Sequence, residues 1–365
     1  MTPPSAPALK EIFNRERLEH IAEAMLAVDP AFDRRGFLQL ATRDLAGLSV
    51  MQRLARVSES LHAVLPVGYE ANLARLYALA PRLNSRFVCM FLPHYVASYG
   101  RHDFERSMVA LKHFTTFGSS EFAIRPFLAS DPQRTLAVLR DWARDANEHV
   151  RRLASEGSRP RLPWSFRLER LQADPALAAP ILEQLKADPS PYVRKSVANH
   201  LNDITKDHPD WVLELIESWS LEHPRTAWIA RHALRSLIKQ GNRRALAIVG
   251  AGQRPQVRLQ ELRVEPAVIR LGQRINLSFA LESTADSSQH LVVDYAIDYV
   301  KASGTTSAKV FKLKALTLPA GAREQLGRAQ HIRELTTRRH YPGRHALHIL
   351  VNGERLGSTA FDLQP

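Results

Sequence analysis

Three carboxylates in an otherwise basic chain could stabilise a developing positive charge. Glu121 follows three small residues at the predicted start of a helix, Glu156 stands one helical turn after Arg152, and Asp203 lies at the end of a predicted helix. Carboxylates beside a sugar can stabilise oxocarbenium character and orient a water, as they do in glycoside hydrolysis. Each acid also has a simpler explanation. The helix dipole would favour Glu121 at a helix start, and Glu156 could form an i,i+4 ion pair with Arg152 that contributes about 0.2–0.5 kcal/mol. Asp203 could cap the next segment.

Trp164 is the aromatic residue that could take part in binding beside these acids. A tryptophan usually packs into the core. Here prolines and the cations Arg159, Arg161 and Arg167 surround it, which favours a partly exposed ring. Such a ring could stack on a sugar or offer its π face to a cationic base.

The charge of the chain predicts an anionic partner. Its 365 residues include 50 Lys and Arg against 37 Asp and Glu, a formal net charge of +13. Nucleic acid is the commonest partner for such a surplus, and an acidic membrane surface is the alternative. No run approaches the roughly 18 apolar residues of a membrane span, and no signal-peptide core is present. The single cysteine, Cys89, excludes an intrachain disulfide and fits a reducing cytosol, so we expect a soluble cytoplasmic protein.

Other site signatures are missing from the sequence. No His-Glu-x-x-His motif or comparable metal spacing occurs, and no Gly-rich loop could cradle a phosphate. We therefore predict no metal site.

The first two thirds of the chain have helical periodicity. Apolar residues recur at spacings of three and four from about Leu9 to Val249, and helix-start signals such as Asp131-Pro132 follow one another. An arginine after an apolar residue recurs at Arg151, Arg194 and Arg231, with spacings of 43 and 37 residues. HEAT-type repeats run at about 40–47 residues. The pattern predicts a mainly α protein, a HEAT-like helical solenoid with a concave surface.

After Gly252 the pattern alternates with the period of a β-strand. Such runs occupy 256–265, 276–281, 290–300, 309–318 and 345–351, separated by turn residues such as Gly304, Gly321 and Asn352-Gly353. Roughly seven short strands in about 110 residues suggest a small immunoglobulin-like β-sandwich. We therefore divide the chain into a repeat domain, 1–252, and a sandwich domain, 256–365.

Several segments carry a family resemblance. They are Gly118-Ser119-Ser120-Glu121-Phe122-Ala123-Ile124-Arg125, the stretch from Ser155-Glu156-Gly157 to Pro163-Trp164, the run from Asp188-Pro189 to Asn202-Asp203, and Asp207-His208-Pro209. The repeat region resembles the AlkC/AlkD superfamily of DNA alkylation-repair glycosylases. Sandwich segments at 300–304, 309–314 and 336–345 resemble the C-terminal module of the AlkC branch.

The resemblance implies a monofunctional DNA glycosylase that removes N3-alkylated cationic bases during base excision repair. It implies 3-methyladenine as the chief substrate and associates 3-methylcytosine with the AlkC branch. It also implies no metal and no organic cofactor, and action without flipping the base into a deep pocket. The expected partner is double-stranded DNA, and we expect a monomer without membrane contact. On this basis Glu121, Glu156 and Asp203 are the predicted catalytic residues, with Trp164 as an aromatic wall.

Basic residues that could contact phosphates occur in both domains. Phosphate contacts supply most of the affinity of a DNA-binding protein. In the repeats, Arg151, Arg194 and Arg231 could equally tie neighbouring repeats together by ion pairing. The predicted phosphate ligands are Arg152, Arg159, Arg161, Lys195 and Arg235 in the repeats, and Arg338, Arg339, Tyr341 and Arg344 in the sandwich.

Two alternatives remain at this stage. A non-catalytic HEAT scaffold could bind a peptide or an acidic protein, and an architectural DNA-binding protein would need no chemistry. Both would tolerate loss of the three carboxylates, whereas an enzyme would not.

Overall fold

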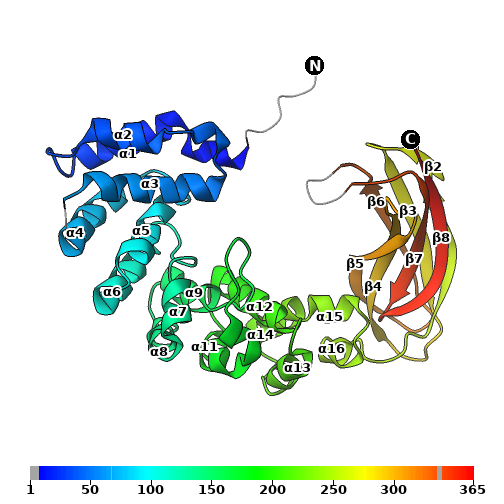
Figure 1. Ribbon diagram of the computed structural model, residues 1–365. Helices are drawn as coiled ribbons and strands as arrows, with labels where there is room; N and C mark the ends of the chain where they lie inside the picture. The colour runs from blue at the N-terminus through cyan, green and yellow to red at the C-terminus, as the bar shows by residue number, and fades with distance from the viewer. Residues whose placement is uncertain (1–7, 67, 335–338) are drawn as a thin grey trace. The chain divides into compact units, whose positions relative to one another are not determined.

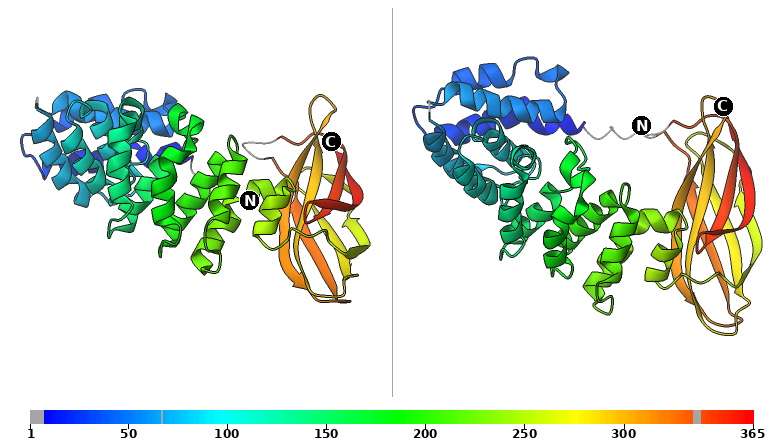
Figure 2. Two further views of the ribbon diagram at one scale, coloured as in Figure 1. Left: turned by 90° about the horizontal axis from the view of Figure 1, so that it is seen from below. Right: turned by 60° about the horizontal axis from the view of Figure 1, so that its bottom comes forward.

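The computed structural model describes residues 8–66, 68–334 and 339–365 (Figures 1 and 2). The chain forms two compact units that divide between Asp207 and His208. No helix among the described residues has the length and apolar character needed to cross a membrane.

The first unit is built from helices. Its α-helices are α1 (Arg15–Leu26), α2 (Arg34–Ala41), α3 (Val50–Val64), α4 (Tyr69–Leu79), α5 (Phe91–Tyr99), α6 (Phe104–Phe114), α7 (Arg125–Ser130), α8 (Pro132–Trp142), α9 (Glu148–Gly157), α10 (Glu169–Ala173), α11 (Ala179–Leu185) and α12 (Pro191–Ile204). Short 3₁₀ turns are η1 (Leu9–Phe13), η2 (Leu45–Gly47), η3 (Ala80–Arg82), η4 (Val88–Met90) and η5 (Pro175–Ala178). Helices α3 and α5 pack together, as do α9 and α12.

Side-chain caps explain many of the helix starts. The Asp131 carboxylate accepts a hydrogen bond from the Arg134 backbone N–H (3.1 Å) at the start of α8, as the sequence predicts. The predicted helix start at Glu121 is wrong, because residues 121–124 form turns and α7 begins at Arg125. Ser120, which precedes Glu121, is buried, and its hydroxyl is directed toward α6, where it donates to the Leu111 carbonyl (2.8 Å).

Two equivalent arginines show a repeated local structure. Arg151 donates to the carbonyls of Asp145 and Ala146, and Arg194 donates to those of Asp188 and Pro189, six and five residues before it in each case. Arg151 also makes a two-point ion pair with Asp188 (2.7 and 3.1 Å). The ion pair of Arg151 with Asp188 favours the structural alternative, a role in tying segments together, for this arginine. We keep the HEAT-like solenoid as a proposal that this repetition supports.

The second unit combines four helices with two β-sheets. The helices are α13 (Pro209–Glu217), α14 (Pro224–Ala233), α15 (Arg235–Lys239) and α16 (Arg243–Ile248). The strands are β1 (Val257–Glu265), β2 (Val268–Arg270), β3 (Arg274–Ser283), β4 (Gln289–Val300), β5 (Thr306–Leu318), β6 (Arg323–His331), β7 (Gly343–Val351) and β8 (Glu354–Gln364). One sheet has the order β1-β3-β6 and the other β2-β8-β7-β4-β5.

The two sheets enclose an apolar core. Phe279 of β3, Val293 and Ile297 of β4, and Leu347 of β7 are fully buried in it. The sequence predicts five of the strands in place, and the Asn352-Gly353 turn joins β7 to β8 with both residues at positive φ (47° and 79°). The short strand β2 and the polar strands β6 and β8 were not predicted.

Helix gives way to strand near the predicted domain boundary, since α16 ends at Ile248 and β1 begins at Val257. The division into compact units falls earlier, because the four helices α13 to α16 group with the sheets. The boundary at residues 252–256 therefore stays a proposal about sequence domains.

Candidate active site

Two packed helices hold the acids that form the centre of the site. Helix α9 begins after Asn147, which caps the His149 N–H (2.8 Å), and α12 begins after Ser190, which caps the Tyr192 N–H (3.2 Å). Glu156 lies in the last turn of α9 and Asp203 in the last turn of α12. Both helices therefore bring a buried carboxylate to the same end of their shared contact, Glu156 at 6% and Asp203 at 4% exposed.

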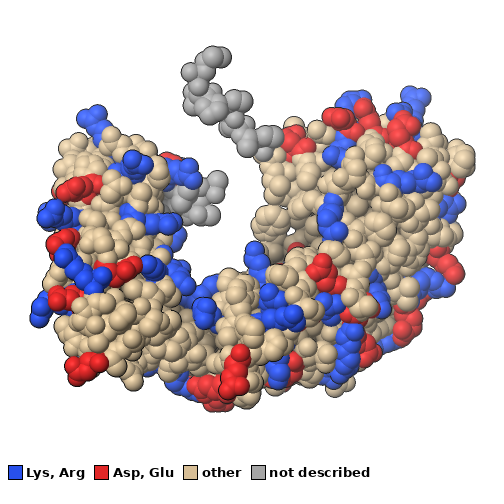
Figure 3. All heavy atoms as spheres, turned by 180° about the vertical axis from the view of Figure 1, so that it is seen from behind, with Lys and Arg blue, Asp and Glu red and all other residues tan. Residues whose placement is uncertain are grey.

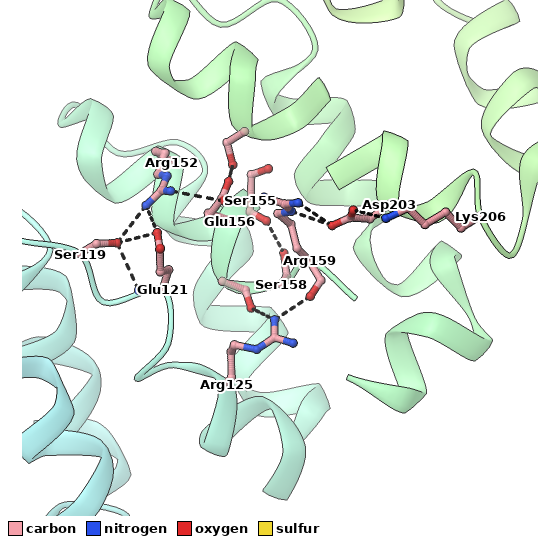
Figure 4. Close-up of polar contacts among 12 residues, drawn as sticks. Ser119, Glu121, Arg125, Arg152, Ser155, Glu156, Ser158, Arg159, Asp203 and Lys206 are labelled. Atoms are coloured by element: carbon pink, nitrogen blue, oxygen red, sulfur yellow. Dashed lines mark hydrogen bonds and ion pairs between the residues drawn. The ribbon is translucent and has the colours of Figure 1, made fainter. Parts of the chain in front are cut away.

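Arg159 joins these two carboxylates (Figure 4). Its Nη1 lies 2.6 Å from Glu156 Oε1, and its Nε and Nη2 each lie 2.8 Å from Asp203 Oδ2. Arg159 is itself only 7% exposed. Burial alone would lower the pKa of this guanidinium, but the charges of Glu156 and Asp203 outweigh burial and raise its pKa.

Arg152 extends the cluster to the third predicted acid. One of its nitrogens contacts Glu121 and donates to Ser119 Oγ (2.9 Å), and another lies 3.4 Å from Glu156 Oε1. At the far end, Lys206 Nζ lies 3.2 Å from Asp203 Oδ1. Acids and cations thus alternate along one chain of contacts, which we call the carboxylate cluster: Glu121, Arg152, Glu156, Arg159, Asp203 and Lys206 (Figure 4).

Two further side chains fix the geometry of this cluster. Ser196 of α12 donates to Glu156 Oε2 (2.6 Å), so both oxygens of that carboxylate accept hydrogen bonds. Arg125 of α7 is fully buried and donates to the carbonyls of Gly157 (3.2 Å) and Arg159 (2.6 Å). Burial, followed by repulsion from Arg159, lowers the pKa of Arg125 to about 10. Sequence reasoning assigned no role to these residues, although Arg125 ends one of the segments that carry the family resemblance.

Trp164 lies on the surface, in the segment between α9 and α10. Its side chain is 63% exposed, and its backbone has a φ of 67°, in the left-handed region that a bulky residue rarely adopts. Strained backbone of this kind clusters at binding sites. Another exposed aromatic, Tyr192, lies in the first turn of α12, and the Arg152 Cζ is 5.1 Å from its ring centroid. Tyr192 was not among the predicted site residues.

The comparisons with known proteins decide the family. The chain is 71% identical to a Pseudomonas fluorescens protein whose structure is described as the alkylpurine DNA glycosylase AlkC bound to DNA containing an abasic site analogue. The match covers 98% of this chain and 100% of that one, with a TM-score of 0.96. The chain belongs to the AlkC branch of the DNA alkylation repair family.

Other relatives agree with this membership. The model of the DNA alkylation repair enzyme family matches residues 87–237 of this AlkC-family chain, and the model of the C-terminal Ig-like domain of YhaZ matches residues 258–365. The uncharacterised protein YhaZ of Bacillus subtilis (strain 168) is 41% identical over 97% of this chain and 99% of its own length. The chain is therefore a helical region followed by an Ig-like β domain.

The structure changes the interpretation of several predicted phosphate ligands of this AlkC-family chain. Arg159 is buried and Arg152 half-buried, and both pair with acids of the cluster, so these contacts favour holding carboxylates over contact with DNA. Arg161 makes a two-point ion pair with Asp207 (2.8 and 2.6 Å), whereas Lys195 is exposed on α12. The contacts therefore favour Lys195 over the other three.

The remaining predicted phosphate ligands lie in the second unit. Arg235 is half-buried and donates to the His232 carbonyl (2.6 Å). Arg339 and Arg344 are exposed and Tyr341 is half-buried, while Arg338 lies outside the described residues. In the part of the chain that the structure describes, no three His, Cys, Asp or Glu side chains group in a way that could hold a metal ion.

Proposed function

We propose that this protein is a monofunctional DNA glycosylase that hydrolyses the N-glycosidic bond of N3-alkylated, cationic bases during base excision repair. The substrates are 3-methyladenine and 3-methylcytosine in double-stranded DNA. The proposal rests on one observation: three carboxylates from separate segments meet in a single buried cluster in a chain that is 71% identical to a DNA glycosylase.

The composition of the cluster suits a substrate that already carries a positive charge. An N3-alkylated base leaves without being protonated, so the protein must stabilise the sugar as it gains oxocarbenium character and must place a water. Carboxylate oxygens of Glu121, Glu156 and Asp203 supply the negative charge. Arg152 and Arg159 have raised pKa values and cannot serve as acids, so they act by holding those oxygens in place.

The surface charge supports DNA as the partner. Lys and Arg outnumber Asp and Glu in the chain, and Figure 3 shows basic side chains, in blue, spread over both units. Exposed Lys195 lies on the same helix as Asp203 and could contact a phosphate close to the cluster. Trp164 would offer its exposed ring to the sugar or base next to the lesion, without a deep pocket for a flipped base. We further propose a cytoplasmic monomer that needs no cofactor.

Release of modified bases from methylated DNA tests the proposal. The purified protein should liberate 3-methyladenine and 3-methylcytosine and leave abasic sites that break only after alkali, and a chelator should not slow release. Absence of any released N3-methyl base would overturn the enzyme and favour a DNA-binding scaffold.

A pair of variants separates chemistry from folding. Glu156→Gln should lower release about 10²–10³-fold, the scale seen when one preorganised electrostatic group is lost, while duplex binding stays near normal. Asp188→Asn is the matched control, because it weakens a buried ion pair with Arg151 that lies outside the cluster. Equal losses of release per folded molecule in the two variants would show that Glu156 is only structural.

A further inference from the structure

The second unit contains a pocket with a largely apolar wall and several basic residues in its lining, and it shares no residue with the carboxylate cluster. It lies between the C-terminal helices and strands β4 and β5, and it offers about 60 Å³ to the centre of a water-sized sphere, room for a few waters or one tetrahedral anion. Its polar lining consists of Arg231, Arg235, Lys239, His290, Asp294 and Lys312. Ile238, Val249, Val292 and Ala315 complete the wall.

An irregularity in the sheet shapes this pocket. His290, Val292 and Asp294 alternate along β4 and line the pocket together, as residues on one face of a strand do. On β5 the register shifts opposite Val293 and Asp294, so that Lys312 pairs with Asp294 while Ala315 pairs with Val292. Both of these β5 residues therefore line the pocket although they are three positions apart. Bulges of this kind commonly change the direction of side chains beside functional sites.

Asp294 is the unusual member of the lining. It is 4% exposed, and its carboxyl group makes no hydrogen bond or ion pair of normal length with the described residues. Burial raises the pKa of Asp294 to about 6, although the charges of Lys239 and Lys312 act in the opposite direction. A buried polar group without a partner is uncommon and calls for an explanation.

The charges around Asp294 point to an anionic ligand. Four basic side chains face one acid across the pocket, which leaves a surplus of three positive charges. Arg231, Lys239 and Lys312 are exposed side chains on α14, α15 and β5. A simple anion would be attracted by these cations but would meet the carboxylate of Asp294.

We propose that this pocket binds a phosphate monoester, a phosphate group that retains a proton on one oxygen. The P–OH group would donate to the Asp294 carboxylate while the other oxygens accept from Lys239, Lys312 and Arg231. The second ionisation of a phosphate monoester lies near pH 6, so the protonated form is available around neutrality. A phosphodiester or sulfate has no such proton, so it would bind only after Asp294 itself has taken up a proton. This site does not depend on the glycosylase proposal.

Calorimetry with inorganic phosphate and sulfate at pH 7 tests the selectivity. The intact chain should bind phosphate about tenfold more tightly than sulfate, because at pH 7 a carboxyl with a pKa of about 6 must first take up a proton before it can donate to sulfate. In Asp294→Asn the amide can donate to either anion, and the preference should fall to about one. Equal binding of the two anions by the wild type, or no phosphate binding at millimolar concentrations, would overturn the proposal.

Two lysines on β5 give a matched comparison. Lys312→Met removes a cation of the pocket and should weaken phosphate binding about tenfold. Lys314→Met removes a lysine that pairs with Glu324 (2.6 Å) and does not line the pocket, so it should leave binding unchanged. Thermal unfolding verifies that all three variants fold. Identical phosphate binding by both lysine variants would place the anion elsewhere and refute the site.

Oligonucleotide competition identifies the source of the phosphate. If a 5′-phosphorylated duplex displaces bound phosphate and its 5′-hydroxyl counterpart does not, the ligand is a DNA end. If neither displaces it while a nucleoside monophosphate does, the ligand is a free nucleotide. Both results support the monoester site. Displacement by the 5′-hydroxyl duplex would show that the pocket takes a phosphodiester, and the proposal would fail.

Discussion

His200, a buried residue of α12, should make the stability of the protein sensitive to acid. It belongs to α12, between Ser196 and Asp203, and is fully buried. Neither ring nitrogen makes a well-formed hydrogen bond within the described residues. Burial, together with repulsion from Arg159 and Arg125, lowers the pKa of His200 from its ordinary 6.5 to about 3, although the Ser155 backbone weakly favours the proton. The folded protein therefore keeps this imidazole neutral.

The size of the effect follows from proton linkage. Above pH 6.5 the ring is neutral in both states and has no influence on pH dependence. As pH falls below 6.5 the unfolded chain takes up a proton that the folded chain refuses, so stability decreases until the folded pKa is reached. Between pH 8 and pH 5 this one residue lowers the free energy of unfolding by about 2 kcal/mol. Any folded pKa below 4 gives the same value at pH 5, because the unfolded pKa then sets it.

Urea unfolding at pH 8 and pH 5 measures this contribution by difference. His200→Phe keeps a planar ring and removes the titration, so its loss of stability on acidification should be smaller than that of the wild type by about 2 kcal/mol. His331→Gln removes an exposed histidine and serves as the control. Nitrogen NMR of labelled histidine should show a neutral His200 ring at pH 5. An unchanged pH dependence in His200→Phe, or a protonated ring at pH 5, would refute the reasoning.

Further predictions concern the ion pairs and the DNA. Arg159→Met leaves two buried carboxylates without their partner and should destabilise the protein by about 3–5 kcal/mol in urea unfolding; a change below about 0.5 kcal/mol would contradict it. Arg151→Met should also destabilise, yet base release per folded molecule should persist. The logarithm of duplex affinity should fall with the logarithm of salt concentration, at a slope of about −0.9 per phosphate contact. Lys195→Ala should remove about one such contact. A flat salt response would argue against DNA as the partner. Joint replacement of Arg339 and Arg344 by alanine should weaken binding, with release recovering at high enzyme concentration.

Local signals in the sequence predict much of the architecture. Alternating apolar residues locate strands β1, β3, β4, β5 and β7, and Asn352-Gly353 marks the hairpin turn because both residues tolerate positive φ. The helix start at Glu121 was mispredicted because Ser120 does not cap a helix there. Its side chain is buried, with the hydroxyl directed at the Leu111 carbonyl of α6. Local sequence does not reveal that contact.

The candidate site was only partly predictable for a related reason. The acids Glu121, Glu156 and Asp203 could be named one by one, but their connection depends on contacts across 31 and 44 residues of sequence. An arginine in a basic segment suggests phosphate binding when partners are unknown. Once the fold brings Arg152 and Arg159 between acids, the same guanidiniums become internal counter-charges.

Alternating charge is what allows three acids to occupy one buried region. Carboxylates this close would repel one another, and a buried charge is tolerated only when it is paired and hydrogen-bonded. Each acid of the cluster therefore has a guanidinium beside it, and Glu156 and Asp203 have a further donor in Ser196 and Lys206.

The same arrangement limits the chemistry that the cluster can perform. The donors around the carboxylates are guanidiniums, an ammonium and hydroxyls, so the cluster offers carboxylate oxygens, balanced by cations, but no ready acid for a departing neutral base. A leaving group that is already cationic needs no such acid, which is why the geometry fits N3-alkylated bases better than undamaged ones.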